Sequence, residues 1–115
     1  MRIEIRGDKM EVTERIKNQI EAKLDKLNQY FEHPEELKAY VVVRTRNKEE
    51  IIEITITTPK FSLRAETSHE DVLSALDISM DKLERQIRKN KTKMRKRFKE
   101  IVRMHLEEQD EVETE

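Results

Sequence analysis

Three consecutive segments in which apolar and polar residues alternate constrain the fold most strongly. They cover residues 38–46, 51–58 and 61–66, with turns expected at residues 47–49 and 59–60. Their apolar side comprises Ala39, Val41 and Val43, then Ile52, Ile54 and Ile56, then Phe61, Leu63 and Ala65. A period of two is typical of β-strands, and a single apolar face is typical of an antiparallel sheet covered on one side.

The N-terminal third predicts a fourth strand followed by a helix. Residues 2–6 alternate like the other strands, and Gly7, the only glycine, frees the backbone to turn after them. Residues 13–31 predict a helix because their apolar residues recur every three or four positions. That stripe comprises Val12, Ile16, Ile20, Leu24, Leu27 and Phe31. Thr13 is the expected N-cap, and Pro34 stops the helix because the residue before a proline avoids helical angles.

The last predicted element is a helix that is longer than the sheet it would cover. It is expected to begin near Ser68, where Ser68 and Asp71 match a capping box. Its apolar stripe comprises Leu73, Leu76, Met80, Leu83 and Ile87. The stripe breaks at Asn90, and its sparse continuation comprises Met94, Phe98 and Ile101. From residue 70 to 98 such a helix is about 43 Å long, roughly twice what a small sheet covers, so its C-terminal part should project.

These elements give the order β-α-β-β-β-α and an α+β fold. Both helices have one apolar stripe and the sheet has one apolar face, so both helices should pack on that face of a four-stranded sheet. A chain of 115 residues fits one such domain, which we place at residues 1–99. Residues 100–115 are expected to form an acidic, disordered tail or linker.

Charge is distributed very unevenly, although the formal net charge is only -1. Residues 82–99 hold ten Lys and Arg residues against Glu84 alone, a net charge of +9. Residues 100–115 hold seven carboxylates and one base, a net charge of -6. The helix dipole explains one or two cations near a helix C-terminus but not ten, so the basic run predicts an anionic partner.

Three kinds of partner compete for the basic run. Nucleic acid fits best, because Lys and Arg side chains near phosphates release counterions. A coiled-coil or protein partner would need a maintained apolar seam, and a membrane surface would need more large apolar residues on one face. RNA fits better than DNA, since no helix-turn-helix, zipper or zinc module is present. With 4% aromatic residues, base stacking on an open platform is not expected, and recognition should rest on charge and shape.

Catalytic and metal-binding patterns are missing from the sequence. There are no cysteines, one glycine and three scattered histidines, which excludes thiolate sites and glycine-rich phosphate loops and disfavours a metal site. Asp77 and Asp81 lie four residues apart, but we interpret them as ion-pair partners of nearby bases and not as a catalytic pair. We therefore expect no enzyme activity, no cofactor and no small-molecule substrate.

The sequence shows no targeting or membrane segment. No apolar run approaches the roughly 18 residues of a membrane span, and the alternating N-terminus with Glu4 does not match a signal peptide. These features predict a cytoplasmic protein without a membrane partner.

The last helix carries the most specific resemblance to a known family. Residues 70–93 resemble the signature helix of the ribosome hibernation-promoting factors, also called ribosome-associated inhibitors or sigma-54 modulation proteins. The core of the match is Asp81-Lys82-Leu83-Glu84-Arg85-Gln86-Ile87-Arg88-Lys89. Residues 12–31 resemble the first helix of that family, and the order of elements agrees along residues 1–98.

The resemblance implies a function as well as a fold of four strands and two helices. It implies binding to the small ribosomal subunit and its ribosomal RNA near the decoding centre. There the protein would block tRNA and mRNA access, silencing and preserving idle ribosomes under stress or in stationary phase. Carried over by position, the residues that touch RNA phosphates would be Lys82, Arg85, Arg88, Lys89, Lys91 and Lys93. The rest of the basic run adds Arg95 and Lys96, and the first helix adds Arg15, Lys23 and Lys26.

The sequence departs from the family pattern within the signature helix. Asn90 stands where a tyrosine is usual, which removes a possible stacking ring, and Leu73-Ser74-Ala75 replaces a Tyr-Ala-Ala run. Long members of the family carry a C-terminal domain that pairs ribosomes, whereas this sequence ends in a linker-like tail. The chain is therefore either a short member or the N-terminal domain of a longer one, and as an isolated domain it is expected to be monomeric. The resemblance implies ribosome binding but not ribosome dimerisation.

A second class of function stays open from the residues alone. As the older family name suggests, the chain could regulate transcription by binding a protein through the open face of the sheet. Tyr40 and Val42 are the apolar candidates on that face. Salt separates the two hypotheses, because phosphate contacts weaken steeply with ionic strength and an apolar interface does not.

Overall fold

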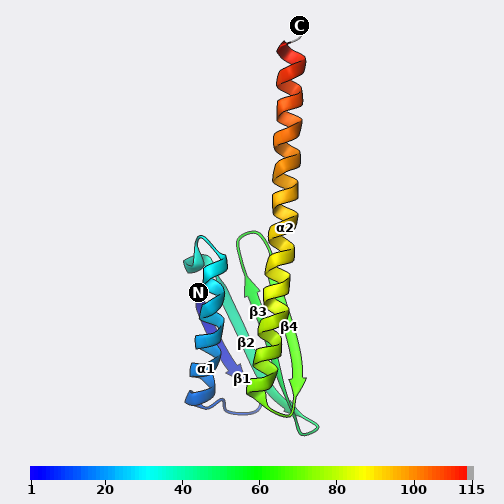
Figure 1. Cartoon of the computed structure of the whole chain (residues 1–115). Coiled ribbons are helices and arrows are strands. Elements are labelled where there is room, and N and C mark those ends of the chain that lie inside the picture. The colour runs from blue at the N-terminus through cyan, green and yellow to red at the C-terminus, as the bar shows by residue number, and fades with distance from the viewer. Residues whose placement is uncertain (114–115) are drawn as a thin grey trace.

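The computed structural model describes the backbone of residues 1–113 and the side-chain surroundings of residues 1–107. Its elements follow the predicted order β-α-β-β-β-α, which confirms the fold class. They are β1 (Arg2–Gly7), α1 (Glu14–Asp25), the short 3-10 helices η1 (Lys26–Tyr30) and η2 (Pro34–Glu36), β2 (Lys38–Arg46), β3 (Glu49–Thr57), β4 (Ser62–His69) and α2 (Val72–Glu113). Both helices lie on the same face of the sheet, and α2 continues far beyond it (Figure 1).

The four strands lie in the sheet in chain order, β1-β2-β3-β4. The pairs β2–β3 and β3–β4 are antiparallel hairpins, in which Val41 lies opposite Ile54, and Ile54 opposite Ala65. The pair β1–β2 is parallel. The antiparallel arrangement predicted for the three consecutive strands is confirmed. The pairing of β1 was not predicted, and it is parallel because α1 crosses over between β1 and β2, as parallel connections require.

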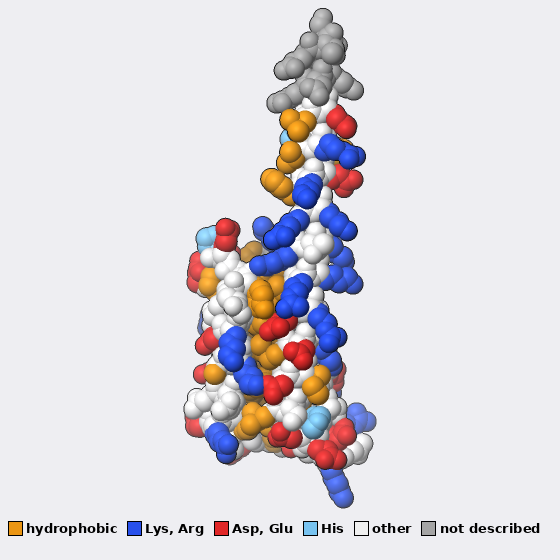
Figure 2. Space-filling model, viewed as in Figure 1, with side chains coloured by type: hydrophobic (Ala, Val, Ile, Leu, Met, Phe, Trp, Pro, Cys, Tyr) orange, Lys and Arg blue, Asp and Glu red, His pale blue; other side chains and the backbone are white. Residues whose placement is uncertain are grey.

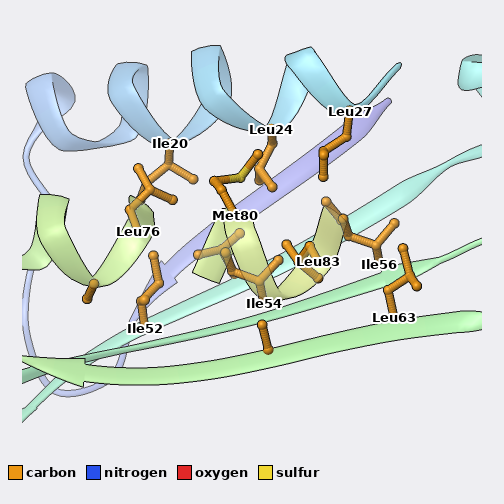
Figure 3. Close-up of a cluster of buried hydrophobic side chains, with 14 of the residues drawn as sticks. Ile20, Leu24, Leu27, Ile52, Ile54, Ile56, Leu63, Leu76, Met80 and Leu83 are labelled. Carbon is orange, nitrogen blue, oxygen red and sulfur yellow. The ribbon is translucent and has the colours of Figure 1, made fainter. Parts of the chain in front are cut away.

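The core lies between the sheet and the two helices (Figure 3). The predicted apolar faces are buried there, and the fully buried side chains include Ile20, Leu24, Leu27, Val41, Ile52, Ile54, Ile56, Leu63, Leu76, Leu83 and Ile87. Each helix contributes one apolar stripe to the core, and each strand contributes every second residue. The spacing of apolar residues in the sequence therefore matches the spacing of buried residues in the structure.

The start of α2 differs from the prediction. Ser68 belongs to β4, where it pairs with Ile51 and its hydroxyl donates to Glu49. The capping box of Ser68 with Asp71 is therefore wrong. Asp71 alone caps α2, because its carboxylate accepts hydrogen bonds from the backbone N–H groups of Leu73 (3.4 Å) and Ser74 (3.3 Å).

The C-terminal segment also differs from the prediction. Where disorder was expected, α2 continues as a helix to Glu113, and residues 114–115 lie outside the described residues. The reason is that residues 100–113 contain no proline or glycine, and a helix already anchored by its first turns propagates at little cost. Arg103 and Glu107, four positions apart, form a 3.9 Å ion pair along this part. The boundary between a domain at 1–99 and a tail at 100–115 stays a prediction.

The first helix is shorter than predicted, although its stripe is correct. Thr13 caps α1 by accepting a hydrogen bond from the backbone N–H of Ile16 (3.3 Å), as expected. The α-helix ends at Asp25, and the chain then tightens into η1 before Phe31 turns extended. A last turn of 3-10 type is common at helix ends. Within the described residues, no helix is both long and apolar enough to span a bilayer.

Replacing Leu83 by alanine should lower the free energy of unfolding by about 2–5 kcal/mol, because it leaves a cavity in a fully buried part of the core. The matched control is Leu106→Ala on the same helix, where the side chain is 56% exposed and the change should stay within about 0.5 kcal/mol. Urea unfolding followed by circular dichroism measures both. Equal losses in the two variants would contradict the assigned core.

The cap of α2 should give the protein a specific loss of stability in acid. Hydrogen bonds from the Ser74 hydroxyl and from the Leu73 and Ser74 amides hold the pKa of Asp71 below its ordinary 3.8. A lowered pKa means that the stabilisation is present above pH 3.8 and is lost as the pH falls through the folded-state pKa. Asp71→Ala should therefore lower the thermal midpoint at pH 7, and the deficit should shrink below pH 3.8.

Asp71→Asn is the matched control, because asparagine also caps helices but does not titrate. Its thermal midpoint should lie near that of the wild type at pH 7. A deficit of Asp71→Ala that stays constant down to pH 2 would show that the charged cap contributes nothing.

Candidate nucleic-acid interface

The basic run begins where α2 still packs on the sheet and continues along the part that projects beyond it (Figure 2). Six of the predicted RNA-binding side chains are exposed there, and none forms an ion pair with a described residue. They are Arg85, Arg88, Lys89, Lys93, Arg95 and Lys96. Like charges without partners raise the energy of the free protein, and a polyanion removes that cost. Arg97 and Lys99, which were not among the predicted contacts, are exposed beside them and extend the same surface.

The helix repeat places several of these cations opposite the apolar stripe. At 3.6 residues per turn, Arg85, Lys89 and Lys96 point away from the side of α2 that carries Leu83 and Ile87. From residue 85 to 99 the surface extends about 21 Å along the axis. Neighbouring charges lie within the Debye length of about 8 Å at physiological salt, so an approaching polyanion meets one continuous positive surface. We call this surface, the exposed Lys and Arg side chains between residues 85 and 99 of α2, the basic rod.

Lys82, the first cation of the predicted set, is bound to the sheet. Its ammonium donates to the backbone oxygen of Glu66 (2.8 Å) and to the hydroxyl of Thr67 (3.1 Å). Thr67 is itself buried and accepts a 2.8 Å hydrogen bond from Ser79, which is fully buried. Lys82 therefore helps to hold α2 on β4, and its contact with RNA stays a prediction.

Two further predicted cations also have partners inside the protein. Lys91 donates to the backbone oxygen of Tyr30, and its Nζ lies 5.8 Å from the ring centroid of Tyr30 and 5.6 Å from that of Phe31. Lys23 forms an ion pair with Asp77 and so joins α1 to α2. That pair also gives Asp77 the structural role expected of it, although its partner lies on the other helix.

The remaining candidates on α1 are separate from the basic rod. Arg15 lies in the first turn of α1 and Lys26 follows its last residue, so the two stand at opposite ends of the helix. Both are exposed and without an ion pair among the described residues. The structure thus divides the predicted set into a continuous rod on α2, three cations bound internally, and two isolated cations at the two ends of α1.

The open face of the sheet has a different electrostatic character. Arg44 pairs with Glu66 at 2.9 Å, and Arg64 pairs with Glu53. Tyr40 is 47% exposed on this face, whereas its neighbour Val42 is half-buried. These two pairs neutralise part of the charge of the open face, whereas the exposed Arg2, Arg6, Lys38 and Arg46 of β1 and β2 have no ion-pair partner among the described residues. Among the described residues, no group of three or more His, Cys, Asp or Glu side chains has an arrangement that could hold a metal ion.

A known family matches most of the chain. Residues 3–95 match the family described as Sigma 54 modulation protein / S30EA ribosomal protein. The chain belongs to this family. Membership of this family, predicted from the signature helix, is thereby confirmed.

Several curated relatives carry one name, Ribosome hibernation promotion factor. The chain is 42% identical over 101 residues to that protein of Bacillus subtilis (strain 168), covering 87% of this chain and 53% of the relative. It is 39% identical over 101 residues to that of Staphylococcus aureus (strain COL), covering 87% of this chain and 53% of the relative. The chain thus spans about half the length of the curated relatives that it matches.

Solved structures share the fold. The N-terminal domain of Protein Y from Thermus thermophilus superposes with a TM-score of 0.71 at 32% identity, covering 77% of this chain and 98% of that one. A ribosomal subunit interface protein from Coxiella burnetii superposes with a TM-score of 0.71 at 20% identity, covering 80% of this chain and 99% of that one. At 20% identity, the second comparison shows the fold alone.

A measurement of stability should distinguish the cations that are bound internally from the exposed cations of the basic rod. Lys82→Met keeps the aliphatic stem and removes two hydrogen bonds to β4, so it should lower the free energy of unfolding by about 1 kcal/mol. Lys89→Met, one of the exposed rod cations, should change it by less than about 0.5 kcal/mol. Urea unfolding of both variants tests this, and an equal effect of the two would show that Lys82 is not an anchor.

Proposed function

We propose that this chain binds the small ribosomal subunit and its RNA near the decoding centre and so keeps idle ribosomes silent during stress. The observation that carries the proposal is the basic rod, a continuous series of exposed cations without ion-pair partners among the described residues. Membership of the family and the names of its relatives support the ribosome as the target.

The mechanism of binding is electrostatic. Each Lys or Arg that approaches a phosphate releases counterions, so binding is strong at low salt and falls steeply as salt rises. The rod is rigid, because its helix is continuous from the core outward, so its cations are already in position before binding. Recognition of this kind reads the shape and charge of folded RNA, not a base sequence.

Silencing then follows from occupancy and needs no bond making or breaking. A rigid basic helix in a channel lined by ribosomal RNA occupies the space that tRNA and mRNA require. The anchoring of α2 on the sheet fixes how far the rod reaches from the domain, and the domain body itself blocks the channel entrance. The chain acts in this way by reversible steric blocking and not as an enzyme.

The alternative is regulation of transcription through the open face of the sheet, in line with the first half of the printed family name. Tyr40 is the large apolar side chain exposed on that face. Its neighbours across the strands are Glu4 and Thr55, and Arg44 and Arg64 further along the sheet are paired with glutamates. A central apolar cluster is usual in protein interfaces, and one exposed ring among polar neighbours does not form one. We therefore favour the ribosomal function.

Co-sedimentation with purified small ribosomal subunits across a salt series tests the proposal. Wild-type protein should pellet with the subunits, and log K should fall steeply and linearly with log salt concentration. The triple variant Arg85→Glu/Arg88→Glu/Lys89→Glu should lose binding at physiological salt. At low salt its slope should be smaller by about 2–3, because three phosphate contacts are lost.

The matched control is Arg2→Glu/Arg6→Glu/Lys48→Glu, which changes the net charge equally but lies on β1 and the β2–β3 turn. It should pellet like the wild type. Binding that falls equally in both triple variants would reveal a dependence on net charge alone. Absence of pelleting by the wild type even at low salt would overturn the ribosomal proposal.

A further inference from the structure

Three of the five aromatic residues of the chain meet at the end of the domain where α2 leaves the sheet. Tyr30, Phe31 and Phe61 line a cleft of about 280 Å³ together with Lys91 and Met94 of α2. The rings of Phe31 and Phe61 lie 6.3 Å apart between centroids and are tilted by 36°. We call this site the aromatic cleft.

The cleft is formed by three separate parts of the chain. Tyr30 and Phe31 follow α1, and Phe61 comes from the turn between β3 and β4. Both segments lie at the end of the domain from which α2 projects (Figure 1), and hydrophobic side chains are visible in the furrow between α1 and α2 (Figure 2). Phe98, 68% exposed and one turn beyond Met94, extends the apolar surface outward.

The aromatic cleft opens directly onto the basic rod. Arg88, Lys91 and Arg95 stand at positions i, i+3 and i+7 of α2 and therefore share one side of the helix. Lys91 lines the cleft, and the two arginines lie one turn before and one turn after it. A phosphate chain that follows these cations passes the mouth of the cleft, so a base attached to it comes within reach of the rings.

We propose that the aromatic cleft receives one unstacked nucleobase of the RNA whose phosphates lie along the basic rod. This inference rests on the proposed RNA-binding function and names a subsite of it. Unpaired bases in RNA loops are commonly held by stacking on aromatic side chains, and Phe31 and Phe61 provide such faces. Glu32 and Glu36 also line the cleft, on the side away from α2, whereas Lys91 of α2 is held against the ring of Phe31 and gives the side that faces the basic rod a positive charge.

The size of the aromatic cleft favours a base over the other apolar occupants. Its volume of about 280 Å³ lies just below the roughly 300–1,000 Å³ of small-molecule sites, which suits a single planar ring system. A docked amphipathic helix would need a row of several anchors, and one cleft provides only one. The low aromatic content of the sequence predicted that no open platform for base stacking exists. Composition alone could not show that the rings of Tyr30, Phe31 and Phe61 meet in one place.

Fluorescence anisotropy with a labelled seven-nucleotide oligocytidylate tests the proposal on the full chain. The comparison probe has the same sugar–phosphate backbone but lacks bases. Wild-type protein should bind the base-bearing RNA about tenfold more tightly than the abasic RNA. Phe31→Leu and Phe61→Leu keep an apolar side chain and remove the ring, so each should abolish most of that preference and leave abasic binding unchanged.

Tyr40→Leu is the matched control, because it removes a ring from the opposite face of the sheet and should keep the full preference. An equal affinity of wild-type protein for the two probes, or no binding of either, would overturn the proposal. Loss of subunit binding in Phe31→Leu without any change in base preference would also overturn it, and would assign the cleft to a protein side chain. Failure of the ribosomal proposal is distinct, because it is seen as wild-type protein that does not pellet with subunits.

A second measurement avoids the risk that the variants fold poorly. Wild-type protein is crosslinked by ultraviolet light to a photoreactive RNA of the same length that carries 4-thiouridine, and the adducts are mapped by mass spectrometry. Adducts at Tyr30, Phe31 or Phe61 support the aromatic cleft as the base site. Adducts confined to other parts of the chain contradict it.

Discussion

The packing of the first turns of α2 against the sheet is the contact on which the rest of the molecule depends. Leu76, Leu83 and Ile87 are fully buried there, between the strands and α1. A segment with a net charge of +9 would not form a stable helix alone, because its like charges repel one another. The buried turns supply the costly nucleus, and the charged turns need only propagate from it. The apolar core therefore provides the rigidity of the basic rod.

Much of the fold could be predicted from the sequence, because burial imposes its own period on helices and strands. Ile52, Ile54 and Ile56 are inward-facing residues of a strand, and their alternation shows it directly. The end of β4 could not be predicted in this way. Thr67 occupies an inward position but is polar, and its hydroxyl is satisfied by Ser79 and Lys82, which are 12 and 15 residues away. A buried polar residue with distant partners interrupts the apolar pattern, so the strand was predicted to end too early.

The charge of the candidate site could be predicted from the sequence. Which of its cations are exposed and which bind other parts of the protein could not. Lys91 and Lys23 look like their neighbours in a charge count, yet their partners lie 61 and 54 residues away along the chain. Contacts of that separation depend on the complete fold. The same reason hid the aromatic cleft, whose rings come from residues 30, 31 and 61 and meet only when α1, the β3–β4 turn and α2 are assembled.

The uninterrupted path of α2 has a consequence for how this chain tolerates change in length. The helix contains no proline or glycine between Val72 and Glu113, so it has no joint that absorbs an extra residue. Inserting or deleting one residue after Ile87 would shift every later side chain by about 1.5 Å along the axis and about 100° around it. Arg95 and Lys96 would then face a different direction from Arg85. A single substitution on the basic rod alters one charge, whereas a change of length by one residue alters the direction in which every later side chain points.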